Sequence, residues 1–187
     1  MQFDPNLTLT GYGVTLRRLS HDRIEMVRNW RNDPKISQYM LTQDYISPEM
    51  QEKWFQKVSQ SETEFYFIVE YQNKPIGLIC IRGINYEKKI GEPGQYIYDD
   101  GYLNSDVGMR AGLCLGQFIW DMLKLEGCYI YILDNNKRAI DYNLLIGYTQ
   151  VDEYVGDNVH KYVITRERAL NPSPKMQRIR KILFKTE

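Results

Sequence analysis

A polar junction in the second half of the chain has residue types that could bind a ligand. The apolar run at residues 128–133 stops at three polar residues, the last of which is Asn136. A helix is expected over residues 136–146, with an exit at Gly147. The amide of Asn136 can both donate and accept hydrogen bonds. This position therefore suits a ligand with peptide-like groups that lies along the strand.

A second candidate site is the loop that leads into a long expected helix. Residues 102–110 read YLNSDVGMR, and the helix is expected to begin at about Ser105. The first turn of a helix offers unpaired N–H groups and partial positive charge, which suit a phosphate group. Gly108 would let such a ligand approach the backbone, and Arg110 would add positive charge. The alternative is an ordinary helix start that is capped by Ser105.

Groups for acid–base chemistry surround a strand expected at residues 94–98. Glu92 lies at the mouth of this strand, and Tyr96 and Tyr98 alternate onto one of its faces. A carboxylate can accept the proton of an ammonium group, whose pKa is about 10, directly or through water. Glu92 is therefore the first candidate for a general base.

The end of the first expected helix combines aromatic and hydrogen-bonding side chains. Trp30, Arg31 and Asn32 are followed by Asp33 and Pro34. Such side chains can donate hydrogen bonds to hydroxyl groups of a ligand and stack on an aromatic ring. The alternative is that Trp30 anchors the core and that Arg31 forms a local ion pair with Asp33.

The elements that must position these groups form a mixed order of strands and helices. The hydrophobic patterns predict strands at residues 14–19, 65–71, 75–84, 94–98, 128–133, 149–155 and 159–165, and helices at 20–32, from Ser47 onward, 105–126, 136–146 and 176–184.

Several burial patterns follow from these assignments. The helix after Ser47 should bury Met50, Trp54 and Val58, and the strand at residues 128–133 should be buried on both faces. Proline cannot donate to a ladder, so Pro93 should stand at the start of its strand. The long helix is expected to bury one apolar face, which consists of Ala111, Leu115, Phe118, Met122 and Leu125.

Residues 129–148, YIYILDNNKRAIDYNLLIGY, resemble the later half of the acetyl-CoA-binding core of GCN5-related N-acetyltransferases. The element order is similar to that fold over about residues 14–165. The resemblance implies an α/β (α+β) fold with a mixed, mainly antiparallel central sheet, splayed strands and flanking helices. It also implies one domain over residues 1–187, with a basic tail at residues 166–187.

The resemblance assigns a role to each candidate residue. Acetyl-CoA would lie between the strands at residues 94–98 and 128–133. The family's phosphate motif matches only at its last glycine, Gly108. The usual proton-donating tyrosine falls on Asn143, so Tyr142 would protonate the thiolate by another route or merely pack. Cofactor contacts are expected from Tyr98, Asn104, Ser105, Gly108, Arg110, Asn136 and Arg138, and acceptor contacts from Trp30, Arg31, Asn32 and Tyr96.

The acceptor depends on which branch of the family the chain resembles. The Trp-Arg-Asn-Asp segment is similar to enzymes that acetylate nucleotide-linked amino sugars and to those that acetylate ribosomal-protein N-termini. We prefer an amino sugar that is linked to a nucleotide, and a protein N-terminus is the alternative. A non-catalytic acyl-CoA-binding domain is the hypothesis from another class, motivated by the incomplete phosphate motif.

The amino-acid composition limits the classes of partner that the protein is expected to bind. The 24 basic residues balance the 24 acidic ones, so no global field favours nucleic acid or an anionic membrane, although RNA binding by the basic tail stays open. The three cysteines lie in apolar segments and indicate neither disulfides nor a metal site, as in a reducing cytoplasm. No leader or membrane segment is expected. The oligomeric state is undecided, and a homodimer stays open.

Overall fold

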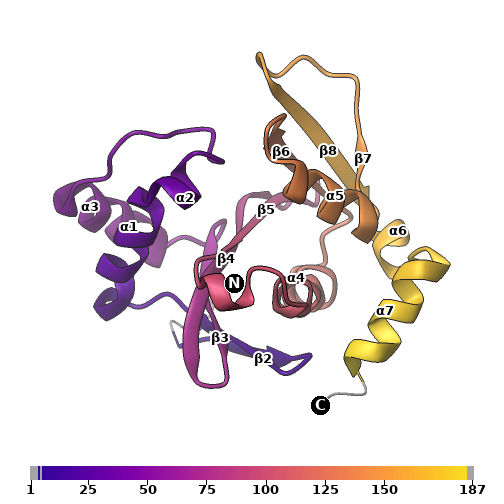
Figure 1. Ribbon diagram of the computed structural model, residues 1–187, viewed down its shortest axis with the longest axis horizontal. Coiled ribbons are helices and arrows are strands. Elements are labelled where there is room, and N and C mark those ends of the chain that lie inside the picture. Colours follow the sequence, from indigo (N-terminus) through magenta and orange to yellow (C-terminus); the bar gives the residue numbers. More distant parts are fainter. Residues whose placement is uncertain (1–3, 5, 185–187) are drawn as a thin grey trace.

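An eight-stranded sheet forms the frame of the computed structural model, which describes residue 4 and residues 6–184 (Figure 1). The strand order is β1-β2-β3-β4-β5-β6-β8-β7, and every neighbouring pair is antiparallel except β5 and β6. The predicted mixed, mainly antiparallel sheet is confirmed. The strands are β1 (Thr8–Gly11), β2 (Val14–Arg18), β3 (Phe65–Tyr71), β4 (Lys74–Asn85), β5 (Ile90–Ile97), β6 (Gly127–Leu133), β7 (Thr149–Gln150) and β8 (Val159–Thr165).

The parallel pair β5 and β6 separates soon after it begins. The two strands are paired only at Ile90 with Gly127 and at Gly91 with Cys128. Beyond this point β6 and its neighbours β7 and β8 extend away from the rest of the sheet (Figure 1). This divergence is the splay expected from the sequence, and it leaves one edge of β5 without a strand partner.

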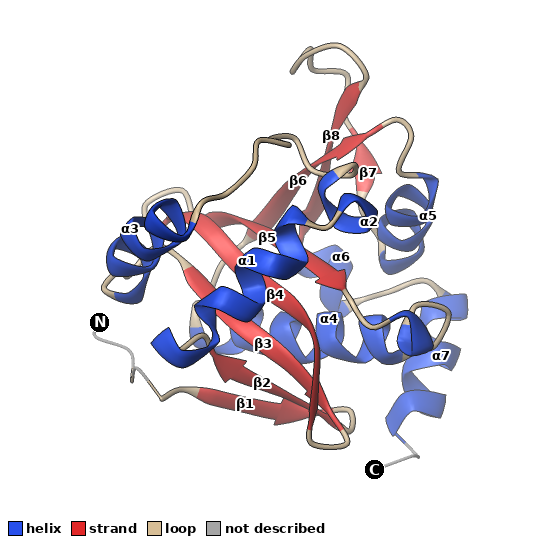
Figure 2. Ribbon diagram, turned by 60° about the vertical axis from the view of Figure 1, so that its left-hand side comes forward, coloured by secondary structure: helices blue, strands red, loops and turns tan. Residues whose placement is uncertain are grey.

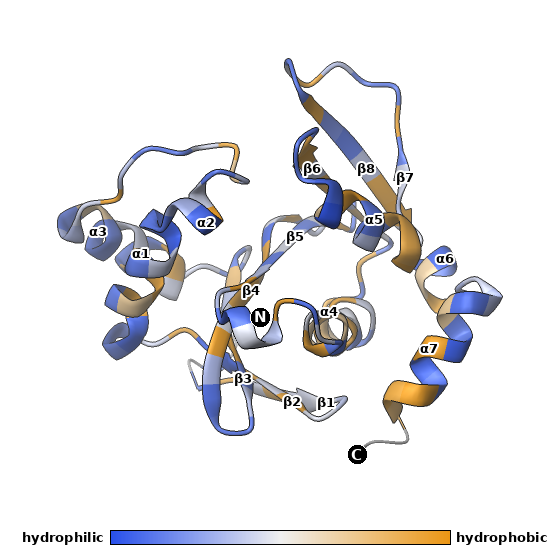
Figure 3. Ribbon diagram, viewed as in Figure 1, coloured by the Kyte–Doolittle hydropathy of each residue, from blue (hydrophilic) through white to orange (hydrophobic). Residues whose placement is uncertain are grey.

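Helices cover both faces of the sheet (Figure 2). Side chains alternate across a strand, so Phe65, Phe67 and Val69 of β3 join the core beneath α4, while Ile68 joins the core beneath α1. Figure 3 shows hydrophobic residues along β4 and in α4. The helical elements are η1 (His21–Arg23), α1 (Ile24–Asn32), α2 (Pro34–Ser37), α3 (Pro48–Ser59), η2 (Asp100–Tyr102), α4 (Val107–Gln117), η3 (Phe118–Met122), α5 (Lys137–Ile146), α6 (Arg166–Leu170) and α7 (Pro174–Phe184).

Helix α3 begins as predicted but buries a different set of residues. The Ser47 hydroxyl accepts from the Met50 N–H at 3.2 Å, which confirms the N-cap. Met50, however, is 52% exposed, and Gln51 is buried in its place. Gln51 can be buried because its amide donates to the Ile24 carbonyl oxygen at 3.0 Å. The predicted burial of Met50 is therefore wrong.

The long helix changes its winding at Phe118. α4 continues into η3, a stretch of π-helix over Phe118–Met122. The wider turn rotates the following side chains, so Met122 is 47% exposed and Leu123 is buried in its place. The prediction for Met122 assumed an unbroken 3.6-residue period and is wrong, whereas Leu125 is buried as expected.

Two strand predictions also need correction. Burial in β6 alternates strictly, so the strand is not buried on both faces. Pro93 lies inside β5, opposite Ile81 of β4, rather than at the strand start. Because β6 has already diverged there, the missing proline N–H leaves no ladder bond to β6 unmade.

The residues that follow β8 pack onto the central structure. Met176 is fully buried, Leu183 is 3% exposed, and Arg180 donates to the Ala169 carbonyl oxygen at 2.9 Å. The N-terminal part of the chain packs against the same helix, since the rings of Tyr12 and Phe184 lie 4.7 Å apart. Elements outside residues 14–165 therefore contribute to the core.

Candidate active site

A cavity of about 1410 Å³ lies where β5 and β6 diverge. Its walls come from β4, β5 and β6, from α4, η3 and α5 along their length, and from the segment that joins α2 to α3. Eight of the predicted site residues line it: Arg31, Glu92, Tyr96, Ser105, Gly108, Asn136, Arg138 and Tyr142.

Trp30 and Tyr98 lie elsewhere. Their rings stack at 5.2 Å with an angle of 18° between the planes, and Trp30 is buried against Ile68 and Leu78. The Tyr98 hydroxyl donates to the Asp33 carboxylate at 3.1 Å. Trp30 is therefore the core anchor named as its alternative role, and Tyr98 fixes the end of α1 to β5 instead of reaching the cofactor.

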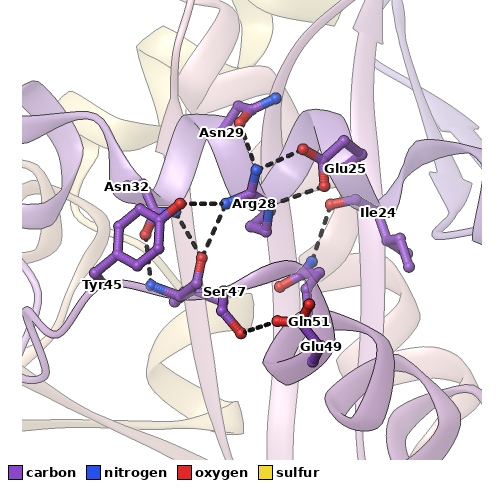
Figure 4. Close-up of polar contacts among 10 residues, drawn as sticks. Ile24, Glu25, Arg28, Asn29, Asn32, Tyr45, Ser47, Glu49 and Gln51 are labelled. Atoms are coloured by element: carbon purple, nitrogen blue, oxygen red, sulfur yellow. Dashed lines mark hydrogen bonds and ion pairs between the residues drawn. The ribbon is translucent and has the colours of Figure 1, made fainter.

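The amide of Asn32 has a structural use. It donates to the Ile46 carbonyl oxygen and accepts from the Ile46 N–H, both at 2.9 Å. Nearby, Arg28 donates to the same carbonyl oxygen at 3.0 Å and to the Tyr45 hydroxyl at 3.1 Å (Figure 4). These contacts hold the segment before α3 against α1. Asn32 does not line the cavity, so its predicted acceptor contact is not supported.

Arg110 is buried on the side of α4 that faces away from the cavity. Its guanidinium donates to the Tyr12 and Leu183 carbonyl oxygens at 2.9 and 3.4 Å and to the Asp106 carboxylate at 2.9 Å. The guanidinium is bonded to protein groups and Arg110 does not line the cavity, so its expected phosphate contact is not supported. Asn104 is exposed and does not line the cavity, so its predicted cofactor contact is not supported either.

One side of the cavity includes the first turns of α4 and α5. Ser105 donates to the Tyr102 carbonyl oxygen at 2.7 Å and accepts from the Val107 N–H at 3.3 Å. The N-cap of α4 is Asp106, one residue later than the alternative role of Ser105 required. The Asn136 side-chain oxygen accepts from the Ala139 N–H at 3.2 Å. The helix thus uses the oxygen of Asn136, and its NH₂ group is the part that could donate to a ligand.

The opposite side of the cavity carries two guanidinium groups near one carboxylate. Arg82 of β4 donates to the Glu92 carboxylate at 2.5 Å, and Arg31 donates to the Thr42 carbonyl oxygen at 2.7 Å. Among the described residues, the buried Arg31 Nη1 and the buried Tyr96 hydroxyl have no hydrogen-bond partner. Burial lowers the pKa of Arg31 and raises that of Tyr96. Polar atoms left unpaired inside a cavity suit a polar ligand.

Tyr142 reaches the middle of the cavity from α5. Its hydroxyl shares a hydrogen bond with the Gln95 side chain, and burial raises its pKa to about 12, an effect that this hydrogen bond partly opposes. Asn143, which occupies the family's tyrosine position, donates instead to the Ala139 carbonyl oxygen at 2.8 Å. Both residues line the cavity, but the Asn143 amide is bonded within its own helix, whereas the Tyr142 hydroxyl meets a side chain of β5.

Sequence reasoning missed Arg82, Gln95 and Gly112, which also line the cavity. The glycines at 108, 112 and 116 recur every four residues, a pattern that marks one bare face of a helix and could have identified Gly112. Arg82 and Gln95 gave no such signal, because a polar residue in a strand usually faces water.

The described part of the chain contains neither a cluster of metal ligands nor a membrane-spanning helix. No group of three or more His, Cys, Asp or Glu in residue 4 and residues 6–184 could hold a metal ion. Within the same residues, no helix has the length and apolar character that crossing a membrane requires.

Comparisons with known proteins identify the family. The sequence model of the acetyltransferase (GNAT) domain matches residues 14–142. The chain is 28% identical over 122 residues to the acetyltransferase PseH of Campylobacter jejuni, covering 65% of this chain and 74% of the relative.

Solved structures share the fold. Spermidine N-acetyltransferase from Vibrio cholerae, in complex with CoA and spermine, superposes with a TM-score of 0.76 at 22% identity over 86% of this chain and 100% of that one. Apo FdhC, described as a nucleotide-linked sugar GNAT, superposes with a TM-score of 0.77 at 18% identity over 96% of this chain and 98% of that one. The chain therefore belongs to the acetyltransferase (GNAT) domain family and is an acetyl-CoA-dependent N-acyltransferase.

Proposed function

We propose that the protein transfers the acetyl group of acetyl-CoA to the primary amine of a nucleotide-linked amino sugar. The observation that carries this proposal is the pair Arg31 and Arg82 on the acceptor side of the cavity, with Glu92 as the nearby carboxylate. One of the two positive charges is balanced by Glu92, and Arg31 keeps a buried, unpaired Nη1. An acceptor with phosphate groups would supply the missing negative partner.

The same charges argue against a polyamine acceptor. A polyamine is a cation along its whole length, so its binding site needs carboxylates rather than guanidinium groups. A sugar nucleotide instead carries an amine at one end and a diphosphate at the other. This choice is supported by the description of FdhC, which is 18% identical, as a nucleotide-linked sugar GNAT. The acetyltransferase PseH is the relative that is 28% identical in sequence.

Glu92 is the proposed general base. It accepts a proton from the acceptor's ammonium, directly or through water, and the neutral nitrogen attacks the thioester carbonyl carbon. The ion pair with Arg82 keeps the carboxylate oriented toward the cavity. Backbone N–H groups on the open edge of β5 would polarise the carbonyl.

Tyr142 is the proposed acid. As the carbon–sulfur bond breaks, its hydroxyl gives a proton to the CoA thiolate, and the resulting phenolate takes up the proton that the attacking nitrogen loses, directly or through water. The products are CoA and the acetylated amine. Acetyl-CoA would be held by the first turns of α4 and α5, with Gly108, Asn136 and Arg138 as the contributing residues.

A thiol-release assay with a panel of acceptors tests the proposal. The panel contains a nucleotide-linked amino sugar, the same sugar without its nucleotide, spermidine and a peptide with a free N-terminus. We expect the highest kcat/KM for the first compound. If the free sugar is preferred, the nucleotide is not part of the acceptor. If spermidine or the peptide is preferred, the assignment of an amino-sugar acceptor is wrong. Binding of CoA by calorimetry without transfer to any amine would support the non-catalytic alternative.

A further inference from the structure

Helix α4 has three glycines that line the cavity. At only one of them would an added Cβ atom clash with a neighbouring group. A Cβ atom at Gly108 would lie 3.6 Å from the Gln95 amide, and one at Gly116 would lie 3.5 Å from the Trp120 indole nitrogen. Both distances are ordinary contacts. A Cβ at Gly112 would lie 2.2 Å from the Tyr142 hydroxyl oxygen, which is well inside contact distance.

Glycine in the middle of a helix costs about 1 kcal/mol relative to alanine. At Gly112 this cost is not explained by backbone conformation, because no positive φ is found there. The only close contact of the added carbon is the hydroxyl at the far end of a side chain. Gly112 therefore makes room for the Tyr142 hydroxyl.

Gln95 fixes the same hydroxyl from the sheet. Its amide nitrogen donates to the Gly108 carbonyl oxygen at 3.3 Å, and its side chain shares a hydrogen bond with Tyr142. The Gln95 Oε1 would lie 3.5 Å from a Cβ at Gly112. Groups from β5, α4 and α5 thus meet at one point, beside the place where β5 leaves β6.

We propose that Gly112 and Gln95 are positioning residues that set the location of the Tyr142 hydroxyl for proton transfer to the leaving thiolate. This inference rests on the proposed acid role of Tyr142. A shift of about 1 Å in a reacting group can cost on the order of 100-fold in rate. Removing a contact of 2.2 Å requires a shift of that size.

The geometry offers a direct test, because the clash involves the hydroxyl alone. The Tyr142 ring carbon that carries the hydroxyl would lie 3.6 Å from the added Cβ, an ordinary contact. Phenylalanine at position 142 should therefore accept alanine at position 112. A double-mutant cycle over Gly112→Ala and Tyr142→Phe separates the two effects.

In the kinetic arm, Gly112→Ala should lower kcat at least 10-fold and leave the KM for acetyl-CoA within about 2-fold. In the Tyr142→Phe background the same change should lower kcat no further. Gln95→Ala should lower kcat in the parent and not in the Tyr142→Phe background. Gly116→Ala is the matched control on the same helix face, and its kcat should stay at the parental value.

Two kinetic results would overturn the proposal. One is an unchanged kcat in Gly112→Ala. The other is an equal loss of kcat from Gly112→Ala in both backgrounds. An unchanged kcat in Tyr142→Phe would remove the acid role and the positioning role together, while acetyl transfer itself would still be observed.

A thermal-unfolding arm requires no acceptor, so it can be read even if the acceptor assignment fails. Alanine should stabilise the helix in the Tyr142→Phe background, because helix propensity then acts without the clash. The same change should stabilise less, or destabilise, when Tyr142 is present. Equal shifts of the Tm in both backgrounds would contradict the proposed contact.

Discussion

Arg82 and Glu92 face each other across β4 and β5, and the guanidinium donates to the carboxylate at 2.5 Å. The Glu92 side chain is only 16% exposed, while Arg82 remains 47% exposed. The cross-strand register thus keeps a carboxylate at the cavity wall with a fixed partner. Neither residue type alone would predict this pairing, because the two are ten positions apart in the chain.

Replacing Glu92 with glutamine should lower kcat by about 100-fold or more, because the amide cannot accept the proton of the acceptor. The KM for acetyl-CoA should change little. Asp99→Asn is the control, since Asp99 pairs with Lys74 at 2.5 Å and does not line the cavity. Steady-state kinetics that gave equal losses for both variants would remove Glu92 as the base.

Replacing Arg31 with alanine should raise the KM for a nucleotide-linked acceptor by about 10- to 100-fold, since a charge-assisted hydrogen bond contributes about 1.5–3 kcal/mol. The KM for acetyl-CoA should stay unchanged. Arg17→Ala is the control, because Arg17 pairs with Glu70 and does not line the cavity. Initial rates at varied acceptor concentration decide the question, and parallel changes in both KM values would contradict the assignment.

Asn136 has two functions that two substitutions can separate. Asn136→Ala removes the cap and the donor, so it should lower the stability by about 1 kcal/mol and raise the KM for acetyl-CoA. Asn136→Asp keeps an acceptor for the Ala139 N–H, so it should keep the stability and still raise this KM. Denaturant unfolding and steady-state kinetics measure the two effects. A KM that is unchanged in both variants would remove Asn136 from the cofactor site.

Alkaline pH should destabilise the protein through its buried tyrosines. Burial raises the pKa of Tyr66, Tyr96 and Tyr142, the last to about 12. Below pH of about 10 these groups are neutral in both states, and their contribution is fully present. Above it the unfolded state ionises first, so the free energy of unfolding should fall. Denaturant titrations between pH 8 and 12 should show a smaller fall in Tyr142→Phe than in the parent.

The basic segment after β8 should act as part of the core. Met176→Ala should cost about 2–5 kcal/mol, because its side chain is fully buried. Ile182→Ala on the same helix should cost less than about 0.5 kcal/mol, since Ile182 is 64% exposed. Denaturant unfolding provides the measurement. Near-equal losses would indicate that α7 is not packed as described.

Most of the element order could be predicted from the sequence because most strands and helices have their own local pattern, but the short elements β1 and α2 were not predicted. Ser47 and Asn136 cap α3 and α5 as their residue types indicate. The change to a π-helix at Phe118 could not be predicted, since no residue in α4 or η3 breaks the helical pattern.

The sequence identified residues that line the cavity where a local motif marks the end of a helix, as for Gly108 and Asn136. It failed where a partner from a distant segment occupies the side chain. From the sequence, the Asn32 amide was expected to bind the substrate. In the structure it is hydrogen-bonded to the backbone of Ile46, fourteen residues later in the chain. Tertiary hydrogen bonds of this kind leave no trace in local sequence.

Arg110 connects the cofactor helix to both ends of the chain, because its guanidinium meets carbonyl oxygens 98 residues before it and 73 residues after it. Residue 183 is among the last described residues to leave the ribosome. Until then the buried charge on α4 lacks one of its neighbours, and the wall of the cavity that α4 forms is incompletely supported. A variant truncated before α7 would keep the residues that line the cavity, but the buried Arg110 guanidinium behind them would lose its hydrogen bond to the Leu183 carbonyl oxygen.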